Sequence, residues 1–258
     1  MTRARLTRGA IGVAGFLIVG ELVIRLWVGR TFDFPAPSAI LYEAALLPVD
    51  PEFLEGSLVT MGNWGLGLLV AVGIAVPLGV LLGSLPTAEQ AVRPLLEFLR
   101  PIPSVAIIPL AILLIPDDAM MKVSVIVYAS LWPILINTLY GMHDVDPVAK
   151  ESMRTFGFGS LAVLGRVSLP SAAPFMATGV RIAAGIALVL AVSAELVAGG
   201  VNGLGVYAVK ASSGNRMDLI MAATLWAGLF GVGANLVLQA AERRLFRWHW
   251  LRTGGVRT

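Results

Sequence analysis

Long apolar stretches recur along this chain, and they constrain its fold more than any other feature. A helix needs about 20 mostly apolar residues to cross a lipid bilayer. The chain is 57% hydrophobic and only 14% charged. A water-soluble domain would carry nearly twice that share of charge, about 25%. The sequence therefore predicts an all-α membrane protein.

We expect six transmembrane helices in a single domain that covers residues 1–258. The third span is short, and the helical segment before it is expected to lead into it. The spans are expected at about 10–28, 56–85, 103–116, 121–141, 172–198 and 217–241.

Charged residues in the loops predict which side of the membrane each loop faces. Lys and Arg are enriched in cytoplasmic loops. Three arginines precede the first span and five follow the last one. The loop at 31–55 has five acidic residues and no Lys or Arg, whereas the loop at 142–170 has three basic residues. We therefore expect an inner-membrane protein with both termini and the loop 142–170 in the cytoplasm.

Several classes of function lack their signature in this chain. A P-loop lysine must follow a glycine, and Lys122, Lys150 and Lys210 follow Met, Ala and Val. The two histidines, His143 and His249, fall at expected cytoplasmic ends, so no catalytic dyad is expected within the membrane. There is no cysteine. We expect no catalytic residue, no metal site and no cofactor in this chain. Because the basic residues cluster at helix ends, we also expect no nucleic-acid partner.

The loop between the fourth and fifth spans is predicted to form two short helices joined by a sharp bend. Asp146 is suited to cap the first helix, and a proline follows it in the first turn. Gly157 supplies the backbone freedom that the bend needs. The second short helix is expected over 160–167, and Leu169-Pro170 is expected to end it. The result is a stiff elbow that projects from the membrane.

This elbow resembles the EAA loop of ABC-importer permeases, in which a glutamate and two small residues precede a glycine and an aliphatic-x-Leu-Pro ending. Glu151, Gly157, Val167, Leu169 and Pro170 match that spacing. Serine and methionine stand where the family has two alanines. The resemblance implies that the elbow docks in a groove on a separate ATPase. The residues it assigns to this coupling contact are Lys150, Glu151, Ser152, Met153, Thr155, Phe156, Gly157, Leu169 and Pro170.

The resemblance covers nearly the whole chain and is closest to the nitrate, sulfonate and taurine group of these permeases. Its motifs include Pro35-Ala36-Pro37-Ser38 and Leu99-Arg100-Pro101-Ile102-Pro103. One departure is Ile115-Pro116-Asp117-Asp118, where the group commonly has a glycine-containing turn. The resemblance implies a type I ABC importer permease fold. It also implies two ATPase copies that bind ATP and Mg, an external substrate-binding protein and a second permease copy, commonly as a homodimer.

Three residues are candidates for the translocation pathway. Arg181 lies inside the fifth span, where it could reach the headgroups, cap a neighbouring helix or line the path. Glu195 lies about 21 Å further along the same helix, at an outer gate or at the outer interface. Asn137 belongs to a stretch of the fourth span that resembles the family. The solute is left open between a nitrate-, sulfonate- or taurine-like molecule and another small organic molecule.

A secondary transporter or channel that needs no ATPase is the alternative function. A proton-coupled carrier usually needs several buried ionisable groups. Only Glu21 and Glu195 are clear acidic residues within the expected spans. Glu21 and Arg25 lie four apart, which favours an intrahelical ion pair over a solute contact. This scarcity of acids favours energy supplied from outside the chain.

Glycines in the second span are predicted to pack against a neighbouring helix, within the chain or in a second copy. Small residues let helices approach closely in lipid. The six glycines concerned are Gly62, Gly65, Gly67, Gly73, Gly79 and Gly83.

Overall fold

The computed structural model describes residues 3–28 and 34–246, and every regular element in these ranges is a helix. Five of the described helices are long and apolar enough to cross a membrane, and one bent pair can form a sixth crossing. The chain divides into two compact units. Within the described ranges, unit 1 joins residues up to 59 with 199–229, and unit 2 joins 60–198 with the residues from 230 on. The single domain expected over 1–258 stays a prediction.

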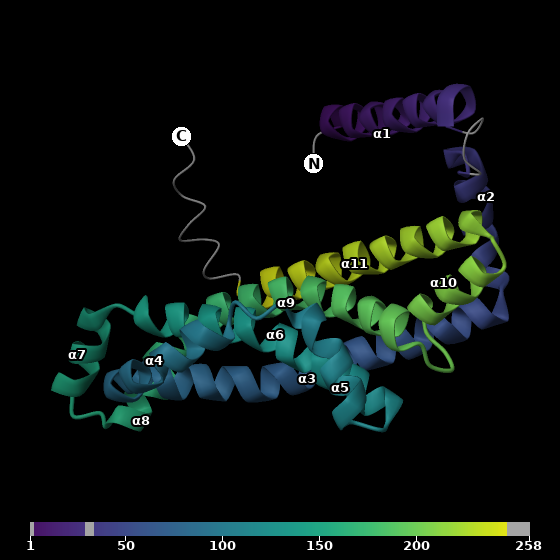
Figure 1. Cartoon of the computed structure of the whole chain (residues 1–258). Helices are drawn as coiled ribbons and strands as arrows, with labels where there is room; N and C mark the ends of the chain where they lie inside the picture. Colours follow the sequence, from purple (N-terminus) through teal and green to yellow (C-terminus); the bar gives the residue numbers. More distant parts are fainter. Residues whose placement is uncertain (1–2, 29–33, 247–258) are drawn as a thin grey trace. The chain divides into compact units, whose positions relative to one another are not determined.

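The helices follow one another along the chain with short connections (Figure 1). Two π-helical segments, Ile24–Val28 and Leu164–Ser168, and two 3₁₀ segments, Leu47–Val49 and Ser104–Ile107, lie between them. The α-helices are α1 (Arg3–Val23), α2 (Pro37–Leu46), α3 (Pro51–Ser84), α4 (Pro86–Leu99), α5 (Ile108–Leu114), α6 (Asp118–His143), α7 (Pro147–Thr155), α8 (Ser160–Val163), α9 (Leu169–Ala198), α10 (Leu204–Ser213) and α11 (Met217–Leu245).

The long helices extend past the spans expected from hydropathy. The span expected from residue 56 belongs to a helix that begins at Pro51, and the span expected to end at residue 241 belongs to a helix that continues to Leu245. Hydropathy marks only the apolar part of a helix, so polar turns at its ends are missed.

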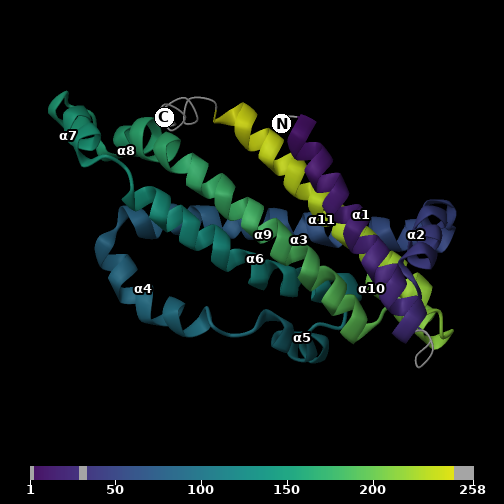
Figure 2. The same cartoon turned by 90° about the horizontal axis from the view of Figure 1, so that it is seen from above.

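Unit 2 is built on α6 and α9, which lie side by side in both views (Figures 1 and 2). They run antiparallel, because Gly141 near the end of α6 lies against Ala172 near the start of α9. Alanines of α9, including Ala187 and Ala191, pack on buried side chains of α6 such as Val125. Small side chains at the interface allow the close packing that holds helices together in lipid.

Glycines of α3 bring this helix against α6. A Cβ at Gly79 would lie 2.7 Å from the Thr138 Cβ, and one at Gly67 would lie 2.5 Å from the Ile126 Cγ2. Gly83 approaches α6 in the same way. A Cβ at each of the other three glycines would meet nothing within 4 Å in the described chain: Gly62, Gly65 and Gly73. The packing prediction is therefore confirmed within the chain for three of the six glycines. For the other three, packing against a second copy stays a prediction.

The third crossing is broken. α4 and the segment from Ser104 to Leu114 meet at an angle of 80°. Pro101 and Pro103 lie in the break and have no N–H with which to continue a helix. The Tyr128 hydroxyl of α6 donates a hydrogen bond of 3.0 Å to the Leu99 carbonyl, at the end of α4. The break therefore has a fixed attachment to α6.

Unit 1 has an aromatic core. Phe53 is 2% exposed, and its ring packs edge-on to Tyr207 at 5.6 Å and lies 6.1 Å from Trp226. The Trp226 indole N–H donates to the Ala44 carbonyl at 2.8 Å. These contacts join the helices on both sequence segments of the unit.

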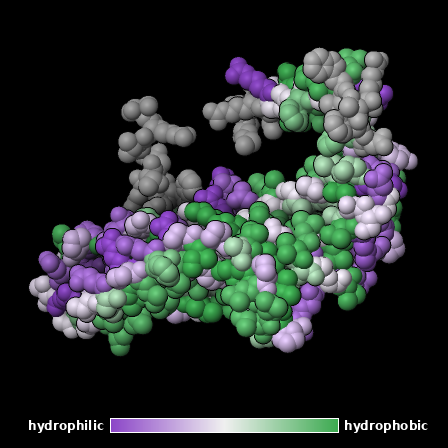
Figure 3. Space-filling view, viewed as in Figure 1, coloured by the Kyte–Doolittle hydropathy of each residue, from purple (hydrophilic) through white to green (hydrophobic). Residues whose placement is uncertain are grey.

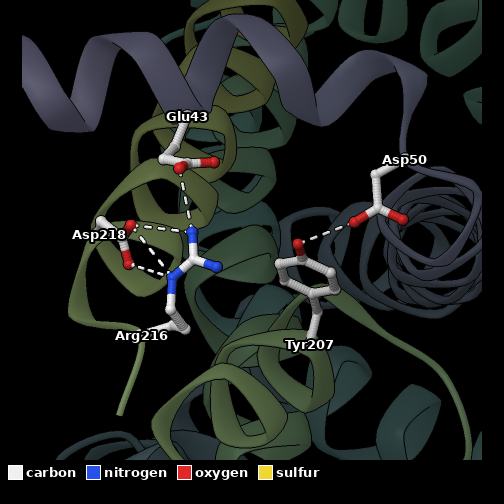
Figure 4. Close-up of polar contacts among 5 residues, drawn as sticks. All are labelled: Glu43, Asp50, Tyr207, Arg216 and Asp218. Carbon is white, nitrogen blue, oxygen red and sulfur yellow. Dashed lines mark hydrogen bonds and ion pairs between the residues drawn. The ribbon is translucent and has the colours of Figure 1, made fainter. Parts of the chain in front are cut away.

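Charged contacts surround this aromatic core (Figure 4). The Arg216 guanidinium donates to Asp218 at 2.9 Å and to Glu43 at 3.0 Å. The Tyr207 hydroxyl donates to Asp50 at 2.9 Å. The hydrogen bond to Asp218 raises the pKa of Arg216, and burial together with the hydrogen bond to Asp50 raises the pKa of Tyr207. Both side chains therefore stay protonated at neutral pH and keep their role as donors.

The ion pair expected in the first span is present and has a third member. Arg25 Nε lies 2.6 Å from Glu21 Oε1. The backbone N–H and the hydroxyl of Ser38 also donate to this carboxylate, at 2.9 and 2.8 Å. The pair therefore connects the end of the first helix to the start of α2.

Substitution of Gly79 tests the α3–α6 contact. Gly79→Ala should lower the free energy of unfolding by about 1–3 kcal/mol, because the new Cβ would overlap Thr138. Gly73→Ala is the matched control, since open space surrounds that position. Thermal unfolding of the purified protein in detergent measures both, and equal melting temperatures would contradict the close contact.

Candidate functional site

The first candidate site is the elbow formed by α7 and α8. Asp146 caps α7 by accepting a hydrogen bond of 2.8 Å from the Val148 N–H. The helix closes at Gly157, whose φ of +84° lies in the left-handed region that glycine adopts readily. The Gly157 N–H donates to the Arg154 carbonyl and the Phe158 N–H to the Met153 carbonyl. The bend is therefore at the residue that the spacing predicted.

The elbow exposes apolar side chains. No residue of α7 is buried. Phe156 is 81% exposed and Leu161 is 84% exposed, and Val148 is exposed as well. Figure 3 shows hydrophilic side chains gathered around α7, whereas hydrophobic side chains cover α3 and α5. Apolar groups on an otherwise polar projection mark a surface for a partner protein.

The residues assigned to coupling lie in different environments within this segment. Glu151, Ser152 and Thr155 are exposed, whereas Lys150 and Met153 are half-buried. Lys150 also lines a cavity of about 730 Å³ beside the last turns of α3. The polar residues Glu151, Ser152 and Thr155 and the apolar Phe156 are therefore the assigned residues most accessible to a partner.

The expectation that Leu169-Pro170 ends the second short helix is wrong. The helical backbone continues from Ser160 to Ala198 without a break. Leu164–Ser168 is π-helical, and the Leu169 N–H donates to the Leu164 carbonyl. Pro170 then lies in the first turn of the α-helical segment α9, a position that does not need its missing N–H. α8 and the following span therefore form one continuous helix, and α7 lies before the bend.

Glu195 is wholly buried. The Thr60 hydroxyl of α3 lies 2.8 Å from its Oε1 and 3.0 Å from its Oε2. A buried carboxyl group is costly unless hydrogen-bonded, and Thr60 supplies part of that compensation. In this conformation the side chain joins α3 to α9 and has no exposed surface toward a pathway.

Arg181 and Asn137 are both half-buried in unit 2, and they have different partners. Arg181 Nε is 3.5 Å from Glu242 Oε2 of α11, so a carboxylate is its partner. Asn137 donates to the Pro133 carbonyl at 2.8 Å. It also lines a cavity of about 470 Å³ together with Phe175. The structure does not bring Arg181, Asn137 and Glu195 together in one contact.

Sequence reasoning missed two charged features of unit 2. Lys122 is wholly buried, and its Nζ lies 2.7 Å from Asp118 one turn earlier. The i, i+4 spacing was the available signal. The second feature is the charged face of α4, which lines a cavity of about 300 Å³ against α6. Within the described ranges, no group of His, Asp and Glu could hold a metal ion.

Comparison with known sequences gives consistent matches. A family model described as "binding-protein-dependent transport system inner membrane component" matches residues 75–248. The Brucella melitensis protein named "probable ABC transporter permease protein" is 30% identical over 242 residues, covering 93% of this chain and 94% of that protein. The taurine transport system permease protein of Escherichia coli is 28% identical over 247 residues, covering 90% of each chain.

A solved structure shares the fold. A chain of a bacterial alginate ABC transporter, crystallised in complex with an alginate pentasaccharide-bound periplasmic protein, superposes with a TM-score of 0.67. The match covers 94% of this chain and 93% of that one at 16% sequence identity.

Removal of the Thr60 hydroxyl tests the buried contact. Thr60→Val should lower the free energy of unfolding by about 1–3 kcal/mol, because the buried Glu195 carboxyl loses a donor. Thr60→Ser keeps the hydroxyl and should stay near the wild type. Thermal unfolding in detergent compares the three proteins, and a Val variant as stable as the Ser variant would show that this hydrogen bond contributes nothing.

Proposed function

Because the chain belongs to the family of binding-protein-dependent transport system inner membrane components, it is the permease subunit of an ABC importer, and we propose that the α7–α8 elbow couples it to the ATPase. It is a multi-pass membrane protein with the type I importer permease fold. The observation that carries the proposal is the elbow itself, capped at Asp146 and closed at Gly157, with Phe156 and Leu161 exposed.

The elbow is suited to transmit a force. Its helices are short and begin or end at defined residues, so the elbow changes its own conformation little when Phe156 is displaced. Because the helix from Ser160 runs on into α9, movement of the elbow moves the span behind it. Closure of the ATPases would then shift the spans between inward-open and outward-open states.

The proposed orientation places both termini and the elbow in the cytoplasm. The arginine-rich ends support it, since basic residues favour the cytoplasmic side. The acidic residues of unit 1, including Glu43, Asp50 and Glu52, would then lie outside, where an external binding protein delivers the solute. An elbow in the cytoplasm is within reach of an ATPase.

The proposed importer contains two permeases, two ATPases and one external binding protein. A homodimer of this chain would place the pathway on the two-fold axis. ATP and Mg would be bound by the ATPase, because no lysine of this chain follows a glycine as a P-loop requires. The proposed solute is a small molecule of the nitrate, sulfonate or taurine kind, and the taurine permease of Escherichia coli supports this choice.

Gly157→Val tests the coupling role. Valine at a φ of +84° is strained by about 1–2 kcal/mol or more, so the bend should open and shift Phe156. We expect ATP-driven uptake in proteoliposomes to fall several-fold relative to ATP hydrolysis, with membrane insertion unchanged.

Gly159→Val is the matched control for this variant. Gly159 has a φ of −70°, and a Cβ there would meet nothing within 4 Å. It should retain the wild-type ratio of solute imported to ATP hydrolysed. A normal ratio in the Gly157 variant, or ion-driven uptake by this chain without any ATPase, would contradict the proposal.

A further inference from the structure

The cavity between the elbow and the last turns of α3 is positively charged. One wall comes from the end of α3 and the start of α4, and the opposite wall comes from α7, α8 and the π-helical segment that follows. Lys150 and Arg154 of α7 line this cavity of about 730 Å³, and no Asp or Glu of the described ranges lines it. The wall therefore carries two positive charges and no carboxylate that balances them.

The two cations lie on the same face of α7. Lys150 and Arg154 are four residues apart, and like charges at this spacing on a helix repel each other. Neither side chain makes an ion pair with a residue that the structure describes. The Lys150 Nζ lies 3.5 Å from the Met142 carbonyl, which is long for a hydrogen bond and supplies no counter-charge. An anion between the two side chains would relieve their repulsion.

The acidic residues nearest to the cavity in the sequence are engaged or placed elsewhere. Asp146 accepts a hydrogen bond of 2.8 Å from a backbone N–H of α7. Glu89 Oε2 lies 2.8 Å from His143 Nε2, and Asp144 lines a different cavity. Glu151 of α7 is exposed and does not line this one. The positive charge of the cavity wall is therefore not cancelled from behind.

Most of the remaining wall is apolar, and part of it reaches the surface. The apolar lining residues are Pro77, Val80, Leu81, Leu85, Pro86, Met142, Leu161, Val163 and Leu164. Leu81 is 55% exposed, Leu85 47% and Leu161 84%. An occupant would therefore meet cations at one side and apolar surface at the other. This combination suits an amphipathic anion better than a small hydrophilic one.

The cavity lies at the end of a long span, at the depth of the lipid headgroups. α3 has 34 residues and is about 51 Å long, whereas the hydrocarbon core of a bilayer is about 30 Å thick. The ends of this helix therefore reach the headgroup layers. Ser84, the last residue of α3, lines the cavity. In the orientation proposed above, this end faces the cytoplasmic leaflet.

We propose that this cavity binds an anionic phospholipid of the cytoplasmic leaflet, with its phosphate between Lys150 and Arg154 and its acyl chains along Leu81 and Leu85. The inference rests on the proposed function only for the choice of leaflet. Basic pockets between transmembrane helices bind anionic headgroups on the cytoplasmic side of other membrane proteins.

The chemistry of the two cations fits a phosphate. The planar guanidinium of Arg154 matches two phosphate oxygens, and the Lys150 ammonium acts as a point charge. The Ser160 hydroxyl also lines the cavity and can donate to the headgroup. A volume of about 730 Å³ is within the range of ligand sites. A lipid held there would brace α7 against the end of α3.

Native mass spectrometry of the purified full chain with phosphatidylglycerol tests the inference. Phosphatidylcholine, which has no net charge, is the comparison lipid and should bind more weakly. Joint replacement by Lys150→Gln and Arg154→Gln should weaken phosphatidylglycerol binding by about tenfold or more and leave phosphatidylcholine binding unchanged. Joint replacement by Lys150→Arg and Arg154→Lys keeps both charges and should preserve most of the affinity.

Two sets of controls separate the site from folding and from general electrostatics. Joint replacement by Arg8→Gln and Arg244→Gln removes two charges at exposed positions outside the cavity and should leave the affinity unchanged. Ser84→Glu adds a carboxylate to the cavity wall at an exposed position and should weaken phosphatidylglycerol binding, whereas Ser84→Gln should not. This pair tests the site even if the double Gln variant at Lys150 and Arg154 does not fold.

Four results would overturn the inference. Phosphatidylglycerol binding could be unchanged in the folded Lys150–Arg154 double Gln variant or in Ser84→Glu. The Arg8–Arg244 control could lose as much affinity, which would show a general effect of charge. Millimolar glycerol phosphate could displace the lipid, which would assign the cavity to a free phosphate. Binding of the ATPase could release the lipid, which would assign the two cations to the ATPase contact.

The lipid measurement is independent of the proposed function, because it needs only this chain. A complex that imports solute, with lipid binding unchanged in the Lys150–Arg154 double Gln variant, would reject only the lipid site. Failure of any ATPase to bind the wild-type chain would reject the proposed function itself.

Discussion

A charge inside a membrane-crossing helix needs a partner, and this requirement organises the polar contacts of the chain. Arg25 pairs with Glu21 on the first helix, and the wholly buried Lys122 pairs with Asp118 on α6. Arg181 of α9 lies beside a carboxylate of α11. Each pair offsets the cost of removing its charges from water.

The sequence predicted those features that depend on short-range rules. Apolar runs located the long helices, because lipid selects for mean hydropathy over about 20 residues. The bend of the elbow was predictable because Gly157 adopts a positive φ that other residues resist, and Asp146 is a common cap. The role of Pro170 was not predictable, because a preceding π-helical segment lets the chain continue through it. The composition of residues Leu164–Ser168 does not predict a π-helical segment.

The candidate pathway was harder to predict because it depends on contacts between distant segments. Thr60 and Glu195 are separated by 135 residues, and a sequence alone does not show that a carboxyl in the fifth span meets a hydroxyl in the second. The charged face of α4 was missed for another reason. A helical segment was expected before the third span, but hydropathy is averaged over many residues and does not show on which side of a helix its charges lie. The spacing of those charges carried the missing information, because it places them on one face that must be covered.

The continuous helix from Ser160 to Ala198 connects α8, the second helix of the elbow, to α9 without a break. α9 packs along α6 through alanines, and α6 contributes Trp132 to the wall of the cavity beside α4. In the proposed mechanism, a displacement of Phe156 would move α9 as a rod and carry α6 with it. Because α4 is attached to α6 at Glu89–His143 and at Leu99–Tyr128, such a movement would also reach the broken third crossing. Coupling would then depend on the packing of α9 against α6.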